Sequence, residues 1–296
     1  MPYIGEIAAL ITALLWSGTA IAFSEATKIV GSFVVNITRL LLATVYLIIT
    51  ILIFNLNFQI SYEQIYLLGL SGVIGLVFGD GFLFKSYQYI GARLSMLVMT
   101  LSPTIAAFMA YLYLDENLST WGILGIVITI SGVSIVVFKR SEQPSDNYKK
   151  NNIGYMFAFL GAIGQAINLI FAKQAFQFGE INSFVATFYR MVPSIFLMYF
   201  IGLIFKSRRT SFSILKEKKE AVKFIIIGSL IGPFLGITFS LIAISNTKVG
   251  IAATLMSTVP LLMLPIVRYY YKEKLSMISI IGAVVAVIGV GILFLK

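Results

Sequence analysis

The chain has 296 residues, of which 59% are hydrophobic and 11% charged, and it contains no cysteine and no histidine. Soluble domains carry about 25% charged residues, so this composition indicates a protein that resides in lipid. The missing residue types exclude disulfides, thiolate metal sites and the side chain that most often transfers protons near neutral pH. The net charge of +10 lies mostly between apolar runs. It therefore predicts contact with anionic lipid rather than nucleic-acid binding.

Ten apolar runs are long enough to span a membrane, which takes roughly 20 helical residues. The predicted spans are 4–23, 33–54, 65–86, 93–114, 121–138, 153–171, 183–205, 222–243, 250–271 and 276–295. The first run starts at Ile4 and continues without a cleavage-like region, so we expect a span there and not a signal peptide. Long polar connectors are predicted after the fifth and seventh spans.

The two halves of the chain repeat the same residue types in one register. A shift of 157 residues places Pro103 on Pro260, Glu116 on Glu273, Gly75 on Gly232, Gly79 on Gly236, Gly125 on Gly282 and Gly132 on Gly289. A shift of 151 places Arg39 on Arg190. This pattern indicates a duplication, with a first repeat at 1–140 (helices 1–5), a polar linker at 141–152 and a second repeat at 153–296 (helices 6–10).

Five spans per repeat is an odd number, so the second repeat must enter the membrane in the opposite orientation. The predicted fold is therefore an all-α membrane protein with ten transmembrane helices arranged as two inverted five-helix repeats. Many secondary transporters have this architecture. Most Lys and Arg residues lie in the loops that follow odd-numbered helices. The positive-inside rule then places these loops in the cytoplasm and both termini outside a cytoplasmic (inner) membrane.

Several motifs resemble the EamA-type repeat of the drug/metabolite transporter superfamily. They are 84–93 (FKSYQYIGAR), 101–103 (LSP), 114–118 (LDENL) and the glycine-rich 121–138, with a second copy at 241–247, 259–260 and 272–275. Leu15-Trp16-Ser17-Gly18 resembles the first-helix signature of that family, and Arg39 resembles its second-helix arginine. The resemblance implies a transporter fold but no single substrate, because the family carries amino acids, nucleotide sugars, other metabolites and drugs.

Two departures from the family pattern concern the substrate site. In the second half Gln165-Ala166-Ile167 replaces the Trp-Ser-Gly of the first. The first helix also lacks the mid-membrane glutamate with which small multidrug relatives bind cations and protons.

Asp80 is the sharpest candidate for chemistry, because it lies deep in the third predicted span between Gly79 and Gly81. An intramembrane carboxylate must be neutral, paired or hydrated. It either contacts a substrate ammonium or couples transport to protons, or it forms an ion pair with Arg39 or Lys85 that fixes helix positions. Its repeat partner is Ile237, so a role shared by both halves is not expected.

Arg39 and Arg190 lie a couple of turns into the second and seventh predicted spans. Their equivalent positions favour a structural role, such as snorkelling or capping a helix end. The alternative is contact with a substrate carboxylate or phosphate.

Polar side chains precede the two repeated prolines: Thr100 and Ser102 come before Pro103, and Ser257 and Thr258 come before Pro260. Proline leaves a backbone carbonyl one turn earlier without its helical partner. The hydroxyls either close a simple kink, or the helix is a partly unwound hinge with a binding site, as in inverted-repeat carriers.

Further candidates for a polar cavity with aromatic walls lie on the first, third and sixth spans. They are Trp16, Ser17, Phe84, Tyr87, Gln165 and Asn168. Phe84 and Tyr87 share a helix face with Asp80 at spacings of four and seven residues. Aromatic side chains in membranes also serve simple packing. Glycine stripes on the third and eighth spans indicate close helix packing, and the glycines of the fifth and tenth spans predict that these helices pack together or support a dimer.

The sequence therefore predicts a secondary active transporter that moves a small metabolite, such as an amino acid or related amphipathic solute, by alternating access in export or exchange. The alternatives are a proton-coupled exporter of cationic drugs or amines and a non-transporting membrane scaffold. No phosphate-binding glycine loop with lysine is present, so a solute or proton gradient would supply the energy. Expected partners are the substrate and membrane lipids, with the chain a monomer or homodimer. We expect no nucleic acid, cofactor, metal or enzymatic activity.

Overall fold

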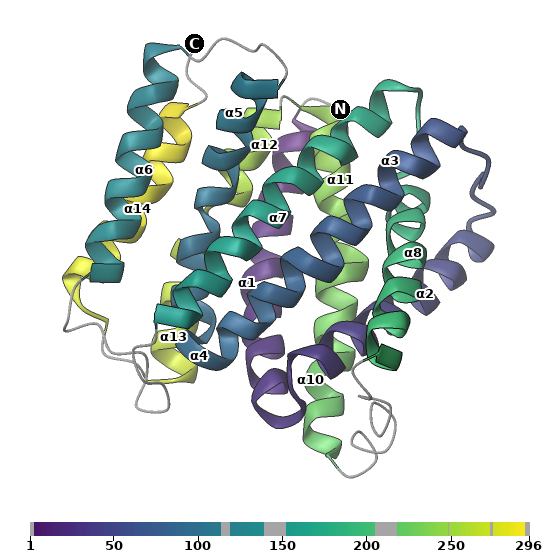
Figure 1. The fold of residues 1–296 in the computed structure, drawn as a ribbon, viewed down its shortest axis with the longest axis horizontal. Helices are drawn as coiled ribbons and strands as arrows, with labels where there is room; N and C mark the ends of the chain where they lie inside the picture. Colours follow the sequence, from purple (N-terminus) through teal and green to yellow (C-terminus); the bar gives the residue numbers. More distant parts are fainter. Residues whose placement is uncertain are drawn as a thin grey trace.

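The computed structural model describes residues 3–113, 119–138, 152–204, 218–247, 249–272 and 275–293. Within these ranges every regular element is a helix (Figure 1). In the first half these are α1 (Ile4–Val30), α2 (Ser32–Ile53), α3 (Tyr62–Gly72), η1 (Val73–Gly79), α4 (Asp80–Met99), α5 (Leu101–Tyr113) and α6 (Thr120–Phe138). In the second half they are α7 (Asn152–Gln177), α8 (Ser183–Ile204), α10 (Lys219–Ser229), η3 (Leu230–Gly236), α11 (Ile237–Asn246), α12 (Val249–Met256), α13 (Val259–Tyr270) and α14 (Met277–Leu293).

In this part of the chain, seven helical stretches are long and apolar enough to cross a membrane. They are Ile4–Val30, Ser32–Ile53, Tyr62–Met99, Asn152–Gln177, Ser183–Ile204, Lys219–Asn246 and Ala252–Tyr270. Two shorter apolar helices, Thr120–Val136 and Met277–Ile292, lie side by side in α6 and α14. Large apolar side chains such as Leu14, Leu52 and Phe200 remain exposed. Exposed apolar surface of this extent is stable against lipid and not against water.

The third predicted span is longer than the sequence suggested. Its helix begins at Tyr62 and not at 65, because Ser61 and Gln64 form a capping box in which each side chain bonds the backbone of the other. No loop separates it from the fourth predicted span, since the helical path is interrupted only at Gly91, where φ is 75° and ψ is 170°. Glycine adopts positive φ without steric cost, so the helix is kinked at this single residue.

Each half contains a π-helical segment at the same repeat position. η1 starts at Val73 and η3 starts at Leu230, a separation of 157 residues, which is the shift that relates the sequence motifs. π-Helical turns are rare and are frequent at functional sites. Both lie in the middle of long helices and bring glycines against a neighbouring helix.

The helices that carry the repeated prolines are interrupted, as predicted. α4 ends at Met99 and α5 begins at Leu101, two residues before Pro103, while α12 ends at Met256 and α13 begins at Val259. Their hydroxyls bond carbonyls of the preceding turn: Thr100 bonds Leu97 (2.7 Å) and Thr258 bonds Leu255 (2.7 Å). The breaks are therefore closed internally.

The pairing of α6 with α14 follows from glycines that face backbone across the contact. A Cβ on Gly132 would collide with the backbone of Ala286, and one on Gly289 would collide with the backbone of Thr129. The expectation that the fifth and tenth helices pack together is thus confirmed within the chain, and Figure 1 shows the pair at one edge of the molecule. The repeated glutamates, Glu116 and Glu273, and residues 141–151 of the predicted linker (141–152) lie outside the described residues, while Asn152 begins α7.

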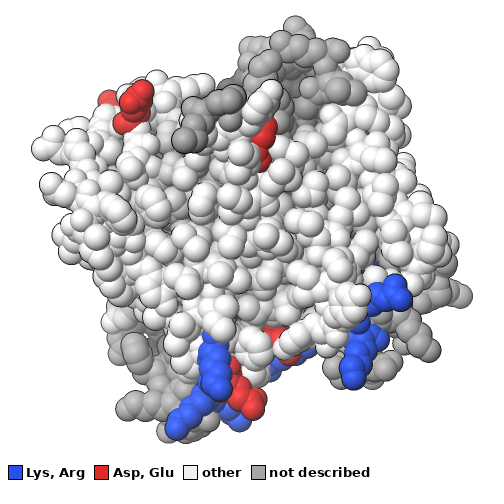
Figure 2. Space-filling model, turned by 180° about the vertical axis from the view of Figure 1, so that it is seen from behind, with Lys and Arg blue, Asp and Glu red and all other residues white. Residues whose placement is uncertain are grey.

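Charge is distributed unevenly along the helix axes. Figure 2 shows Lys and Arg gathered at the lower edge of the molecule, below a broad band without charge. α1 begins and α14 ends at the opposite, upper edge in Figure 1.

Candidate functional site

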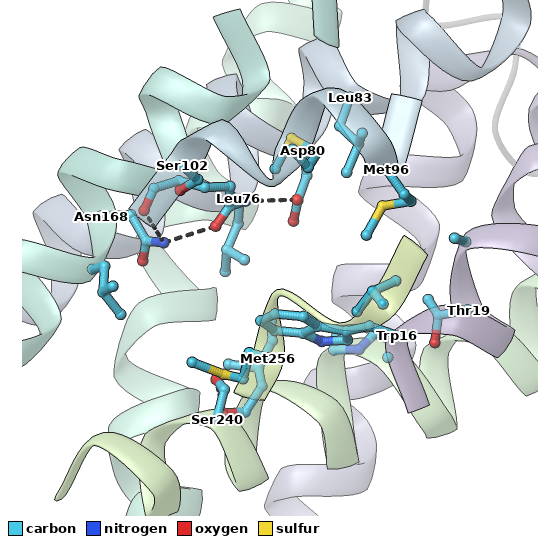
Figure 3. A pocket seen from close by; sticks show the side chains of 18 of the residues that line it. Trp16, Thr19, Leu76, Asp80, Leu83, Met96, Ser102, Asn168, Ser240 and Met256 are labelled. Carbon is cyan, nitrogen blue, oxygen red and sulfur yellow. Dashed lines mark hydrogen bonds between the residues drawn. The ribbon is translucent and has the colours of Figure 1, made fainter. Parts of the chain in front are cut away.

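A cavity of about 170 Å³ lies among helices of both halves, and most of its lining is apolar. An apolar cavity of about 150 Å³ holds a molecule the size of benzene, so this space suits a small solute. In Figure 3, Asp80 and Asn168 lie on one side, and Trp16, Ser240 and Met256 lie on the other. The cavity thus has one polar, charged wall and one largely apolar wall.

Asp80 forms an ion pair with Arg39. The Nη2 atom of Arg39 lies 2.6 Å from Oδ2 of Asp80, and both side chains are largely buried. The guanidinium also lies 4.7 Å from the ring centre of Phe84, which provides a cation–π contact. Its Nε donates to Oδ1 of Asn36 (2.9 Å), and the Asn36 amide donates to the Leu76 carbonyl (2.9 Å). Of the two expected partners of Asp80, Arg39 is the one present.

Two amides extend this pair across the cavity wall. Gln165 Nε2 donates to Oδ1 of Asp80 (2.8 Å), and Asn168 Nδ2 donates to Oε1 of Gln165 (2.8 Å). Oδ1 of Asn168 accepts hydrogen bonds from the Ser71 hydroxyl (2.8 Å) and from Nη2 of Arg190. A continuous hydrogen-bonded chain therefore connects the two arginines.

Arg190 has a buried side chain, 4% exposed, and lines the cavity. Among the described residues no carboxylate pairs with it, since the ion pairs found there are Arg39–Asp80 and Lys28–Glu25. Its Nε makes no hydrogen bond to any residue that the structure describes. Arg190 is therefore a buried cation without a counter-ion from the described residues.

The close approach of the helices depends on glycines at matching repeat positions. A Cβ on Gly75 would lie 2.7 Å from Cγ of Asn168, and one on Gly232 would lie 2.6 Å from Cγ2 of Thr19. Likewise Gly79 faces Gln165 and Gly236 faces Trp16. In each case a π segment of one half meets the first helix of the other half. The first-helix residues also correspond, because Gln165 stands where the first half has Trp16.

Most of the predicted site residues line this one cavity. They are Trp16, Arg39, Asp80, Phe84, Tyr87, Thr100, Ser102, Pro103, Gln165, Asn168, Arg190, Ser257 and Pro260. Ser17 and Thr258 were expected there and are not among the lining residues. Ser17 is fully buried, and its hydroxyl donates to the Leu14 carbonyl (2.7 Å), while Thr258, between α12 and α13, donates to the Leu255 carbonyl of α12 (2.7 Å). Each hydroxyl is thus bonded to a backbone carbonyl three residues earlier in the chain.

Several lining residues gave no signal in the sequence. Met96, Ser240 and Met256 line the cavity but lie in apolar runs that any spanning helix would show. Asn36 and Ser71, which hold Arg39 and Asn168, are buried one layer behind the lining. A buried polar residue four or fewer positions from an intramembrane charge is the pattern that would have identified Asn36.

The fold and site define a multi-pass helical membrane protein that encloses a charged cavity. The EamA-like transporter family model matches residues 3–138 and again residues 152–295. The chain therefore belongs to the EamA-like transporter family, with two tandem copies of the family pattern. This confirms the resemblance to the drug/metabolite transporter superfamily.

Comparison with solved structures supports the fold alone. A crystal structure described only as "Crystal structure of protein" aligns with a TM-score of 0.67 at 14% sequence identity. The alignment covers 97% of this chain and 95% of that one. A search of curated proteins found no match.

Proposed function

We propose that the chain is a secondary active transporter that carries a small amphipathic metabolite, such as an amino acid, across the cytoplasmic membrane. The observation that carries this proposal is the cavity itself, in which a buried charged network faces an apolar wall. Membership of a transporter family supports it. Intramembrane charges are costly and usually mark a substrate or ion pathway.

The proposed mechanism is alternating access between two inverted five-helix repeats. The matched contacts at Gly75 and Gly232, each against the first helix of the other half, support a two-fold relation between the repeats. The apolar helices α6 and α14 and the break at Gly91 fit a path of ten spans. Rocking of one repeat against the other would then open the cavity to each side in turn. Pro103 and Pro260, at the helix breaks, are the proposed hinges.

The uneven charge of the two edges supports an orientation with both termini outside. The edge where Lys and Arg gather in Figure 2 would face the cytoplasm. α1 begins and α14 ends at the other edge.

The alternative of a cation exporter that uses Asp80 is less well supported. Asp80 is already paired with Arg39 and hydrogen-bonded to Gln165, so a substrate cation would have to displace a buried guanidinium. A proton-coupling role for Asp80 would require the same pair to separate.

Reconstituted proteoliposomes test the proposal. Counterflow is measured for radiolabelled amino acids, organic acids, amines and nucleotides, with empty liposomes as the control. Uptake of at least one metabolite class is expected, and no uptake across the whole panel would refute the transport function. An Asp80→Asn variant whose transport keeps its pH dependence would refute proton coupling through Asp80.

A further inference from the structure

The inference concerns the substrate class and rests on the proposed function. We propose that Arg190 binds the carboxylate of the substrate, and that the site selects small monocarboxylates with an apolar tail, for which an ammonium group is not required. Arg39 and Arg190 occupy equivalent positions of the two repeats. Among the described residues Arg39 has a carboxylate partner and a bonded Nε, whereas Arg190 has neither, although its Nη2 donates to Asn168.

In the first half, the guanidinium of Arg39 is satisfied from within. Nε donates to Asn36 and Nη2 contacts Asp80, at 2.9 and 2.6 Å. Asn36 holds one edge of the group while Asp80 neutralises its charge. This is the arrangement expected of a buried arginine with a structural role, because a buried charge is tolerated when it is paired and hydrogen-bonded.

In the second half, both of these partners are replaced. Thr187 stands at the position of Asn36, and Ile237 stands at the position of Asp80. The Thr187 hydroxyl bonds the Ser183 carbonyl (2.7 Å) and lies 3.3 Å from the hydroxyl of Thr238, so it is engaged elsewhere. Ile237 has no polar atom in its side chain. Nε of Arg190 therefore lacks, among the described residues, the acceptor that Asn36 supplies to Arg39, and the guanidinium lacks the carboxylate that Asp80 supplies.

Arg190 and Ile237 both line the cavity, so the place of the missing carboxylate is open to a solute. A substrate carboxylate there would accept from Arg190 and take the role that Asp80 plays for Arg39. Arginine is well suited to this contact, because its planar group offers two parallel donors to a carboxylate.

The charges of the cavity define the ligand further. Its charged lining residues are Arg39, Asp80 and Arg190, which sum to one positive charge. A monoanion makes the occupied cavity neutral, whereas a zwitterion leaves it positive and a cation raises the charge further. Like charges in a site of low dielectric repel strongly. The expected order of affinity is therefore carboxylate, then amino acid, then amine, for the same tail.

The opposite wall fits the remainder of such a molecule. Trp16 and Met256 lie across the cavity from Asp80 in Figure 3, and Leu241 and Ile244 also line it. An apolar tail would be buried there once the carboxylate is bound. The Met256 thioether and the Trp16 indole can pack against tails of different shapes. We therefore expect the head group to decide substrate selection more than the tail does.

The test is thermal stabilisation of the purified full chain in detergent, because a ligand that binds the folded state raises the melting temperature. The probes are matched sets with one tail: 4-methylpentanoate, leucine and 3-methylbutylamine, and 3-phenylpropanoate, phenylalanine and 2-phenylethylamine. We expect stabilisation in the order acid, amino acid, amine. Equal or stronger stabilisation by the amines, or none by any carboxylate, would overturn the proposal.

Variants separate the head-group contact from folding. Arg190→Gln should weaken carboxylate binding by about tenfold to a hundredfold, as expected for loss of a charged hydrogen bond. Ile237→Asp keeps Arg190 but supplies the missing internal partner, so it should weaken carboxylate binding by a similar factor. Ile237→Asn is the matched uncharged variant and should lose less carboxylate affinity than Ile237→Asp. Equal losses in the two Ile237 variants, in folded monodisperse protein, would also overturn the proposal.

Counterflow with the same compounds distinguishes this inference from the proposed function. Carboxylate binding without transport of any compound would leave the Arg190 site standing and refute the transporter. Transport of amines but not of acids would support the transporter and refute the proposed role of Arg190.

Discussion

Arg39 and Asp80 come from different helices, and their charged atoms lie 2.6 Å apart inside the chain. The pair occupies the wall of the cavity, where Asn36 bonds Arg39 from behind the lining and Gln165 bonds Asp80 along the wall. The pair is therefore part of the framework that positions Arg190 and the amides. Its loss should lower the stability of the protein more than it changes substrate specificity.

The first prediction concerns this pair. Asp80→Asn leaves a buried guanidinium without its counter-ion, so we expect the free energy of unfolding to fall by about 3–5 kcal/mol. The double variant Arg39→Met with Asp80→Leu removes both charges and should recover most of that loss, because apolar pairs often replace buried ion pairs without cost. Thermal unfolding in detergent measures both. A single variant as stable as the wild type would contradict the pairing.

The second prediction concerns the packing of α3 against α8. A Cβ on Gly72 would overlap the carbonyl oxygen of Arg190, and backbone cannot move aside as a side chain can. Gly72→Ala should therefore destabilise the protein by about 1–3 kcal/mol and weaken ligand binding by displacing Arg190. Gly69→Ala, in the same helix, is the control, since its nearest atom would be Cγ of Pro193 at 3.7 Å. Equal melting temperatures of the two variants would argue against this contact.

The third prediction uses the absence of cysteine from the sequence. Ser240→Cys places a thiol on the cavity lining, and Ser194→Cys places one at a fully buried position outside it. We expect a small methanethiosulfonate reagent to modify the first and not the second. Ligand should protect Cys at 240, as followed by mass spectrometry. Equal reaction of both variants would mean that the reagent reaches the cavity lining no more readily than a buried position outside it.

The fourth prediction concerns a contact between the two halves at the end of α1. The Tyr271 hydroxyl donates to Oε1 of Glu25 (2.5 Å), and Lys28 pairs with the same carboxylate (2.7 Å). If alternating access separates the halves here, loss of this hydrogen bond should favour the open state by about 1 kcal/mol. Adding Tyr271→Phe to the Ser240→Cys variant should therefore raise its labelling rate about fivefold. Tyr270→Phe, which alters a half-exposed neighbour, is the control. An unchanged rate would exclude this contact as a gate.

The sequence identified the family, the helical membrane class and most of the polar side chains that line the cavity, because charges, prolines and polar groups are conspicuous in apolar helices. It left the partner of Asp80 open between Arg39 and Lys85, since only the packing of α2 against α4 decides between them. The structure places Lys85 beside the ring of Tyr89 instead. Spacing along one helix cannot predict such contacts between helices.

The differences between the predictions and the structure have physical causes. Ser17 and Thr258 were assigned to the cavity because they are polar and stand beside lining residues. A hydroxyl in a membrane helix, however, is readily satisfied by a carbonyl of the preceding turn. The boundary between the third and fourth spans was wrong because one glycine, Gly91, replaces the expected loop. Met96, Ser240 and Met256 could not be distinguished from ordinary lipid-facing or core residues.

The π segments η1 and η3 also give an order of events in the history of the gene. A π segment holds more residues per turn than an α-helix, and such turns interrupt a regular helix as local anomalies. Both halves carry one at positions 157 residues apart. The simplest origin is one ancestral insertion that was copied with the rest, so the irregular turn is older than the duplication. The divergence of Asp80 from Ile237 then came later, on a helix that already had its present shape.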